Sequence, residues 1–130
     1  MRTLIVEDDF TNRLLLQTLL APLGECHVAV NGREAVEAFR LALHDGRGYD
    51  LVCMDITMPE MDGHEAVQEI RHLEKTLRPS RKNLVTIIVT TASDDREDVS
   101  LALQEHCNGY LLKPIDARRL KAVLRTNGLM

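Results

Sequence analysis

The sequence predicts an α/β fold in which five parallel strands form one sheet with helices on both of its faces. Two observations predict this class. Five short apolar segments alternate along the chain with longer segments whose apolar residues recur at helical spacing. The short segments are mostly apolar throughout, which is typical of strands in a parallel sheet covered on both sides. Right-handed connections then give a doubly wound sandwich.

The chain opens with a predicted strand, a helix and a second strand. Residues 3–6 (Thr-Leu-Ile-Val) form the first buried strand. Leucines at helical spacing predict a helix over residues 11–23, and Pro22 with Gly24 marks its end. Residues 26–30 alternate in polarity, which favours a strand at an edge of the sheet.

The next segment combines a capping motif with an apolar stripe. Asn31 is followed three positions later by Glu34, the pattern of a capping box, and apolar residues at helical spacing continue over residues 35–42. The polar, glycine-containing residues 44–48 indicate a loop. Residues 51–54 (Leu-Val-Cys-Met) then form a third buried strand.

A second capping-box pattern precedes the third helix. Asp62 is followed by Glu65, and the apolar stripe that comes after them ends at Leu77. Residues 78–83 form a basic connection that contains a proline. The run from residue 84 to residue 89 is rich in β-branched side chains, so we expect the fourth strand there.

The last elements are a polar helix, a short strand and an amphipathic helix. Residues 94–106 are predicted to form a polar helix whose apolar side chains include Val99, Leu101 and Leu103. Residues 110–112 (Tyr-Leu-Leu) form the fifth strand. Asp116 is placed to cap a final helix whose inner face includes Leu120 and Leu124.

Composition limits the class of protein. The 130 residues are 45% apolar, and the formal net charge is −4; this length fits one domain, residues 1–130. A mildly acidic chain without a basic tract is not expected to bind nucleic acid directly. The three cysteines lie far apart, without metal-ligand spacing. No apolar run approaches the roughly 18 residues of a membrane span, so we expect a cytoplasmic protein without membrane insertion.

Carboxylates, hydroxyls and an ammonium follow four of the five predicted strands. Because the carboxyl ends of parallel strands meet at one edge of a sheet, these side chains should lie together. They are Glu7, Asp8 and Asp9 after the first strand, Asp55 after the third, Thr90, Thr91 and Ser93 after the fourth, and Lys113 after the fifth.

This combination of side chains suits phosphoryl transfer. Carboxylates close together repel one another unless a cation is present. Lys113 supplies one positive charge, and Mg²⁺ binds carboxylate, water and phosphate oxygens. A carboxylate nucleophile, a metal ion, a lysine and a hydroxyl would then surround one phosphoryl group.

Four segments resemble the receiver domain of bacterial two-component response regulators. The resemblance covers essentially the whole chain and implies a flavodoxin-like (βα)5 sandwich with the strand order 2-1-3-4-5. The segments are residues 5–9 (Ile-Val-Glu-Asp-Asp), 50–63 (which contains Asp-Ile-Thr-Met-Pro-Glu-Met-Asp-Gly), 89–92 (Val-Thr-Thr-Ala) and 109–114 (Gly-Tyr-Leu-Leu-Lys-Pro).

By position, the resemblance implies a role for several residues. Asp55 is expected to be the phosphoacceptor, Lys113 the phosphate-binding ammonium and Thr91 the switch hydroxyl. Tyr110 is expected to be the switch aromatic. The bond between Lys113 and Pro114 is expected to be cis.

The resemblance also implies an Mg²⁺ site, with no further cofactor. Asp8 and Asp55 are expected to bind the ion directly, and Thr57 through its backbone carbonyl. Glu7 stands where the family more often has aspartate, and we expect it to act through water. Asp9 falls outside the acidic pair.

The function implied is a phosphorylation-activated switch that catalyses only its own phosphorylation and dephosphorylation. A histidine kinase or phosphotransfer protein would dock near residues 11–19 and phosphorylate Asp55. A downstream protein target would bind the face made by the fifth strand and the helices 94–106 and 116–125. Because the sequence ends after the last helix, we expect a single-domain regulator, similar to chemotaxis regulators, that is a monomer or weak dimer.

The chain departs from the family pattern in length. The interval from Asp8 to Asp55 is several residues longer than usual, and we place the addition in the loop 44–49. The segment 71–83 is also extended and basic, and we favour a solvated surface over a docking patch there.

Two other functions stay open at this point. A small hydrolase or phosphatase with an aspartate nucleophile could use a related sheet, but such enzymes usually carry a second Asp where this chain has Thr57. A degenerate receiver could serve only for docking, although intact Asp55, Thr91 and Lys113 make that unnecessary.

Overall fold

The computed structural model describes residues 1–56, 63–77, 84–91 and 106–130. Its five strands pair in parallel in the order β2-β1-β3-β4-β5, so the predicted fold class and strand order are confirmed. The predicted edge strand, β2, does lie at one edge, and β5 lies at the other. The strands are β1 (Arg2–Val6), β2 (Glu25–Ala29), β3 (Leu51–Asp55), β4 (Thr86–Thr91) and β5 (Gly109–Leu112).

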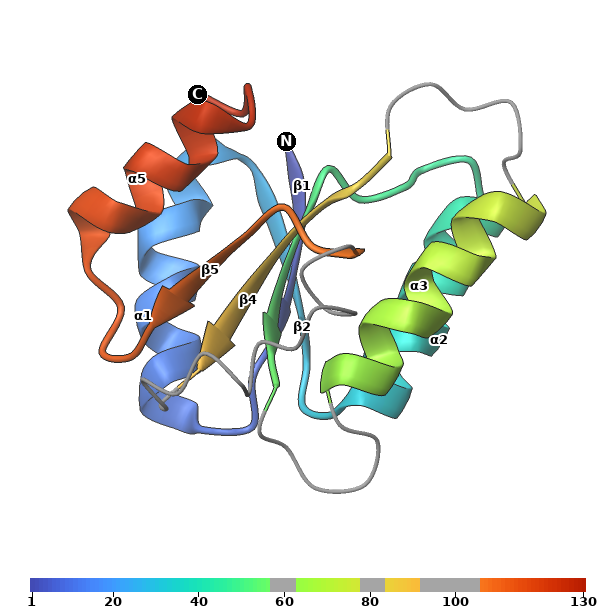
Figure 1. Ribbon diagram of the computed structural model, residues 1–130, viewed down its shortest axis with the longest axis horizontal. Coiled ribbons are helices and arrows are strands. Elements are labelled where there is room, and N and C mark those ends of the chain that lie inside the picture. Colours follow the sequence, from blue (N-terminus) through green and yellow to red (C-terminus); the bar gives the residue numbers. More distant parts are fainter. Residues whose placement is uncertain (57–62, 78–83, 92–105) are drawn as a thin grey trace.

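Helices cover both faces of the sheet (Figure 1). Helices α1 and α5 lie on one face, and α2 and α3 lie on the other. The predicted helix 94–106 falls almost wholly outside the described residues. The described helices are α1 (Phe10–Leu20), followed by a 3-10 turn (Ala21–Leu23), α2 (Gly32–His44), α3 (Gly63–Leu77) and α5 (Ala117–Thr126).

Each face of the sheet has its own hydrophobic core. Alternate residues of one strand point to opposite faces, so Leu4 and Val6 of β1 join one cluster while Ile5 joins the other. Phe39 of α2 is the largest fully buried side chain of the first cluster. Leu16 of α1 lies in the second cluster, together with apolar side chains of α5.

Side-chain caps begin three of the helices. The Asp9 carboxylate accepts a hydrogen bond from Asn12 N (2.9 Å), and the Asn31 side chain accepts one from Glu34 N (2.8 Å). Asp116 caps α5 as the sequence predicted. These caps satisfy backbone donors that have no partner inside the helix.

The predicted boundaries of three elements were wrong by a few residues. β4 begins at Thr86 rather than residue 84 and continues to Thr91; the side chain of Leu84 is 55% exposed. α1 ends at Leu20, because Pro22 lies in the turn that follows and has no N–H to extend the helix. α2 reaches His44, which we had placed in the loop. The pattern of apolar residues predicts which side chains are buried. It predicts less well the residue at which the backbone hydrogen bonds of a helix or strand begin or end.

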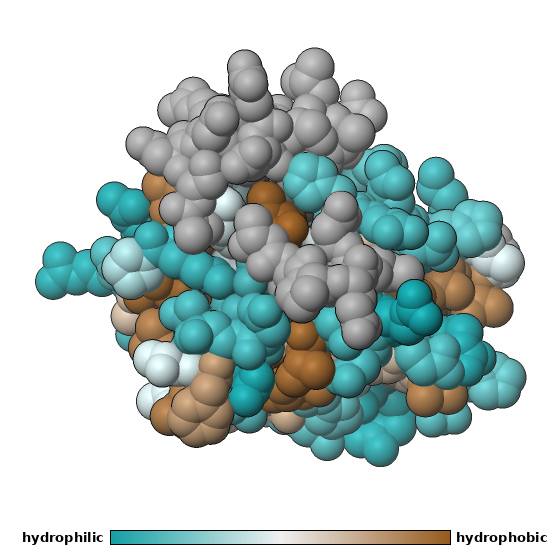
Figure 2. Space-filling view, turned by 90° about the horizontal axis from the view of Figure 1, so that it is seen from below, coloured by the Kyte–Doolittle hydropathy of each residue, from teal (hydrophilic) through white to brown (hydrophobic). Residues whose placement is uncertain are grey.

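All five strands run in the same direction, so their carboxyl ends form one edge of the molecule (Figure 1). Figure 2 shows this edge end-on, with hydrophilic side chains over much of it. Within the described ranges, no helix combines the length and the apolar character needed to cross a membrane.

Candidate functional site

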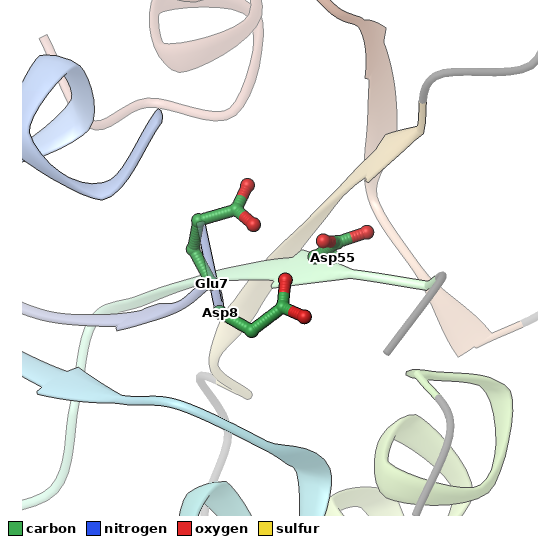
Figure 3. Close-up of side chains that lie close together, drawn as sticks. All are labelled: Glu7, Asp8 and Asp55. Atoms are coloured by element: carbon green, nitrogen blue, oxygen red, sulfur yellow. The ribbon is translucent and has the colours of Figure 1, made fainter. Parts of the chain in front are cut away.

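Three carboxylates meet at the carboxyl edge of the sheet. Glu7 and Asp8 directly follow β1, and Asp55 is the last residue of the neighbouring strand β3. One oxygen from each lies within 4.8 Å of the other two. Figure 3 shows the three side chains turned into one space between the ends of these strands. Glu7 and Asp55 are buried, whereas Asp8 is exposed.

Lys113 reaches the same cluster from the end of β5. Its Nζ lies 2.7 Å from Glu7 Oε1 and donates a hydrogen bond to Asp55 Oδ2 at 3.0 Å. The lysine backbone N–H donates to Thr91 O (2.8 Å), which ties the residue to the end of β4. The bond to Pro114 is cis, as the resemblance implied.

The loop after β1 holds Glu7 from several sides. Asp9 N donates to Glu7 Oε2 (3.2 Å), and Arg13 of α1 donates to the Glu7 backbone carbonyl (3.3 Å). Asp9 itself caps α1, in keeping with its expected place outside the acidic pair. The sequence analysis did not predict this contact of Arg13.

Helix α3 begins in close contact with the strand that carries Asp55. A Cβ at Gly63 would lie 2.6 Å from Asp55 O and 2.5 Å from Ile56 Cα. Both are backbone atoms, so a larger residue would force α3 or the end of β3 to move. The sequence analysis noted Gly63 only within the segment 50–63 that carries the resemblance and missed this constraint.

Two other predicted site residues lie on strands β4 and β5. Thr91 is the last residue of β4 and is buried. Tyr110 lies on β5, the edge strand, with 44% of its surface exposed. Thr57 falls outside the described residues, so its expected role stays a prediction.

A family model described as "Response regulator receiver domain" matches residues 3–125. The chain belongs to the response regulator receiver domain family. It is therefore a receiver domain of two-component signalling, as the sequence motifs indicated.

Individual relatives agree with this assignment. The chain is 41% identical over 120 residues to the hybrid signal transduction histidine kinase B of Dictyostelium discoideum; the match covers 88% of this chain and 6% of that protein. The chain spans 6%, 4% and 14% of the length of three curated relatives that it matches. The expected single-domain organisation therefore stays a prediction.

Two solved structures are close in fold. The receiver domain of sensor histidine kinase PA1611 from Pseudomonas aeruginosa, solved with a magnesium ion coordinated in the active site cleft, has a TM-score of 0.76 and 29% identity, covering 98% of this chain and 97% of that one. The receiver domain of Saccharomyces cerevisiae Ssk1, co-crystallised with the histidine phosphotransfer protein Ypd1, has a TM-score of 0.77 and 33% identity, covering 95% and 86%.

In the acid cluster of this receiver domain, the described carboxylates outnumber the described cations. Burial raises the pKa of Glu7 from 4.5 to about 7; the hydrogen bond from Lys113 opposes this shift and the contact with Asp55 adds to it. Burial alone would lower the pKa of Lys113, but its bonds to Glu7 and Asp55 outweigh burial and raise it. Among the described residues, one ammonium thus faces three carboxylates.

The donor set fits Mg²⁺. The three side chains offer only carboxylate oxygens, the hard ligands that this ion takes. Asp8 is exposed and faces the solvent side, from which a hydrated ion would enter. A divalent cation would also lower the pKa of Glu7, because it would offset the repulsion between the carboxylates.

The pH dependence of stability should report the burial of Glu7. Its pKa is about 7 in the folded protein and 4.5 as a free side chain, so the folded state binds the proton more tightly than the unfolded chain does. Glu7 therefore contributes stability that is fully present below pH 4.5 and is lost as the pH rises through about 7. Without divalent cations, Glu7→Gln should become progressively more stable than the wild type between about pH 5 and pH 8 in urea unfolding.

Glu69→Gln, the same substitution on an exposed position of α3, is the matched control. Mg²⁺ should stabilise the wild type at the upper end of this pH range, since it binds the ionised cluster of the folded state. Wild-type and Glu7→Gln profiles that run parallel across the range would contradict the assigned cause.

Proposed function

We propose that this receiver domain is a phosphorylation-activated switch with Asp55 as its phosphoacceptor. The observation that carries the proposal is the position of Lys113 Nζ, 3.0 Å from Asp55 Oδ2 and 2.7 Å from Glu7 Oε1. The ammonium is already held beside the oxygen that would form the new bond. Such preorganised charge is the main means by which proteins accelerate phosphoryl transfer.

The proposed reaction uses few groups. An Asp55 carboxylate oxygen attacks the phosphorus of a donor phosphohistidine, an O–P bond forms, and the P–N bond breaks with its electron pair returning to the imidazole ring. Lys113 then exchanges its contact with the carboxylate for one with a phosphoryl oxygen. The Thr91 hydroxyl binds a second phosphoryl oxygen. The domain thereby catalyses its own phosphorylation and, with water as the attacking group, its own dephosphorylation.

Mg²⁺ is the cofactor we propose, and when bound it would supply the positive charge that the cluster lacks. Asp8 and Asp55 would be its side-chain ligands. Glu7 Oε2 already accepts a hydrogen bond from Asp9 N, and Oε1 already forms an ion pair with Lys113, which supports a contact through water for this residue. The backbone carbonyl of Thr57 stays in the proposed ligand set on the basis of the resemblance.

Phosphorylation should depend on Asp55 and on the metal ion. Wild-type protein with acetyl phosphate and Mg²⁺ should gain the roughly 80 Da of one phosphoryl group in intact-mass spectrometry. Asp55→Asn should abolish this gain, because an amide is not a nucleophile of the needed kind. A chelator of divalent cations should also abolish it.

Asp45→Asn, at the exposed end of α2, is the matched control and should be phosphorylated like the wild type. Hydroxylamine should remove the added mass, since an acyl phosphate is labile to it. A wild-type protein that never gains a labile phosphoryl group would refute the proposed function, and a phosphoryl group found on Asp55→Asn would refute the assigned acceptor.

The phosphodonor protein is proposed to dock against the beginning of α1. Phe10 and Leu14 lie one helical turn apart, directly after the acidic loop, and are 67% and 51% exposed. An apolar pair this close to the acceptor suits a histidine kinase or phosphotransfer protein that must bring its phosphohistidine to Asp55. The Ssk1 complex with Ypd1 shows one receiver domain of this family bound to a phosphotransfer protein.

Phe10→Ser should therefore slow phosphorylation by a protein donor about tenfold, the loss typical of a central interface residue. Phosphorylated Ypd1 serves as the protein donor and acetyl phosphate as the small one. The rate with acetyl phosphate should not change. Leu41→Ser, which alters an exposed leucine of α2 (47% exposed), is the control. Equal slowing with both donors would show that Phe10 acts on the site and not on docking.

We propose that phosphorylation changes the face formed by β5 and its flanking helices, and that a downstream protein binds there. A new bond from Thr91 to the phosphoryl group would draw the end of β4 toward the site and open space for Tyr110. Tyr110 is 44% exposed here and could then rotate inward. A downstream protein target would bind the altered face more tightly.

NMR spectra with beryllofluoride, which imitates the phosphoryl group, should show shifts at Tyr110 as well as at the acid cluster. Thr91→Val should lose the shifts at Tyr110, because the hydroxyl that couples the two is gone. Thr90→Val, the same change at the adjacent position of β4, is the control. Shifts confined to the acid cluster in the wild type would contradict the proposed output.

A further inference from the structure

The strand that carries Lys113 to the acid cluster is weakly held by apolar contacts. β5 has four residues, lies at an edge of the sheet, and buries only Leu111 fully. Lys113 is the first residue after this strand, so its position depends on how β5 is aligned along β4. A slip of one residue would displace the lysine by about 3.3 Å and turn its side chain to the other face.

Asn108 fixes this alignment at the other end of β5. Its backbone N–H donates to Ile87 O (2.7 Å), and its side-chain Oδ1 accepts from Ile87 N (2.8 Å). Both backbone groups of one β4 residue are therefore bound by one residue that directly precedes β5. This pairing admits a single register, in which Gly109 lies opposite Ile88.

Asn108 is in turn held by Arg71 of α3. Arg71 Nη2 donates to Asn108 Oδ1 (3.0 Å), and Nε donates to His106 O (2.8 Å). Arg71 Nη1 donates to Val85 O (2.9 Å), just before β4, and to Glu74 (2.7 Å). One guanidinium thus binds the chain before β4 and the chain before β5.

Glu74 makes this arrangement rigid. Its side chain is 1% exposed, and its second oxygen accepts a hydrogen bond from Val85 N (2.7 Å). A carboxylate buried to this degree requires its cation and its hydrogen-bond donors. Arg71 therefore has a fixed position relative to the beginning of β4. Its hydrogen bond to Asn108 Oδ1 fixes Asn108 relative to the same point.

We propose that Asn108, held by Arg71, is a remote positioning residue for Lys113: it sets the register of β5 on β4 and thereby places the ammonium in the acid cluster. The inference rests on the proposed function for its kinetic consequence, but its structural consequence stands alone. Asn108 touches neither the acid cluster nor the reacting atoms. It acts through the strand between it and the lysine.

Asn108→Leu is the decisive variant, because it keeps the approximate size of the side chain and removes the acceptor oxygen. Arg71 is less suited, since its loss would leave Glu74 buried without a cation. The first measurement is the NMR scalar coupling across the hydrogen bond from Lys113 N–H to Thr91 C=O. It should fall by about half or more in Asn108→Leu, as expected when a bond lengthens or loses its alignment.

The second measurement is the rate of phosphorylation by acetyl phosphate with Mg²⁺, well below the unfolding midpoint. Asn108→Leu should lower the rate about 3- to 10-fold, the equivalent of one hydrogen bond. Asn108→Asp should restore both the rate and the coupling, because it keeps an oxygen for Ile87 N and Arg71. The control is Asn127→Leu, which should behave as the wild type; the Asn127 side-chain amide donates to Val123 O at the end of α5.

A double-mutant cycle separates positioning of Lys113 from general damage. In a Lys113→Ala background, Asn108→Leu should cause no further loss of rate, since the group that it positions is absent. A further loss there, a wild-type coupling and rate in Asn108→Leu, or a failure of Asn108→Asp to restore them would each overturn the inference. If the wild type is never phosphorylated, the proposed function fails, and the coupling between Lys113 and Thr91 still decides this inference.

Discussion

The structure depends on keeping like charges together at the end of a parallel sheet. β1 and β3 are neighbours, so the acidic residues that end them are forced to within 4.8 Å of one another. The Lys113 ammonium, which follows the far edge strand, offsets this repulsion through its ion pairs with Glu7 and Asp55. The hydrogen bonds from α1 and its loop to Glu7, and the close approach of α3 at Gly63, hold the carboxylates against their repulsion. The site is therefore preorganised to receive positive charge.

Much of the fold follows from the sequence because strands buried on both faces leave a clear pattern. Segments such as residues 51–54 admit few alternatives, and the acidic, hydroxyl and lysine residues at the strand ends could be assigned to one edge before any coordinates were known. The boundaries of β4 could not be predicted as well. Val85 is buried yet precedes the strand, so apolar character alone placed the start too early. The roles of Thr57 and of the helix 94–106 stay predictions.

The polar network around Arg71 was beyond the sequence for a different reason. Arg71 and Glu74 stand three positions apart on α3, a spacing that most often marks an exposed ion pair of little energetic value. Here the pair contacts Val85, the residue directly before β4, and Glu74 is almost completely buried. Only the packing of α3 on the sheet distinguishes the two cases, and packing is a long-range property that a local motif does not contain. The same holds for Gly63, whose need for glycine arises from a contact with Ile56.

The two separate cores have a consequence for how such a domain changes over generations. The cluster beneath α2 and α3 and the cluster beneath α1 and α5 are divided by the sheet, and they share strands but not side chains. Substitutions in one cluster should therefore combine almost additively with those in the other. A lineage can remodel the side that meets a new partner while the opposite side, which supports Gly63 and Arg71, keeps its inherited packing. One small domain can then change the surface that a partner recognises while the acid cluster stays the same.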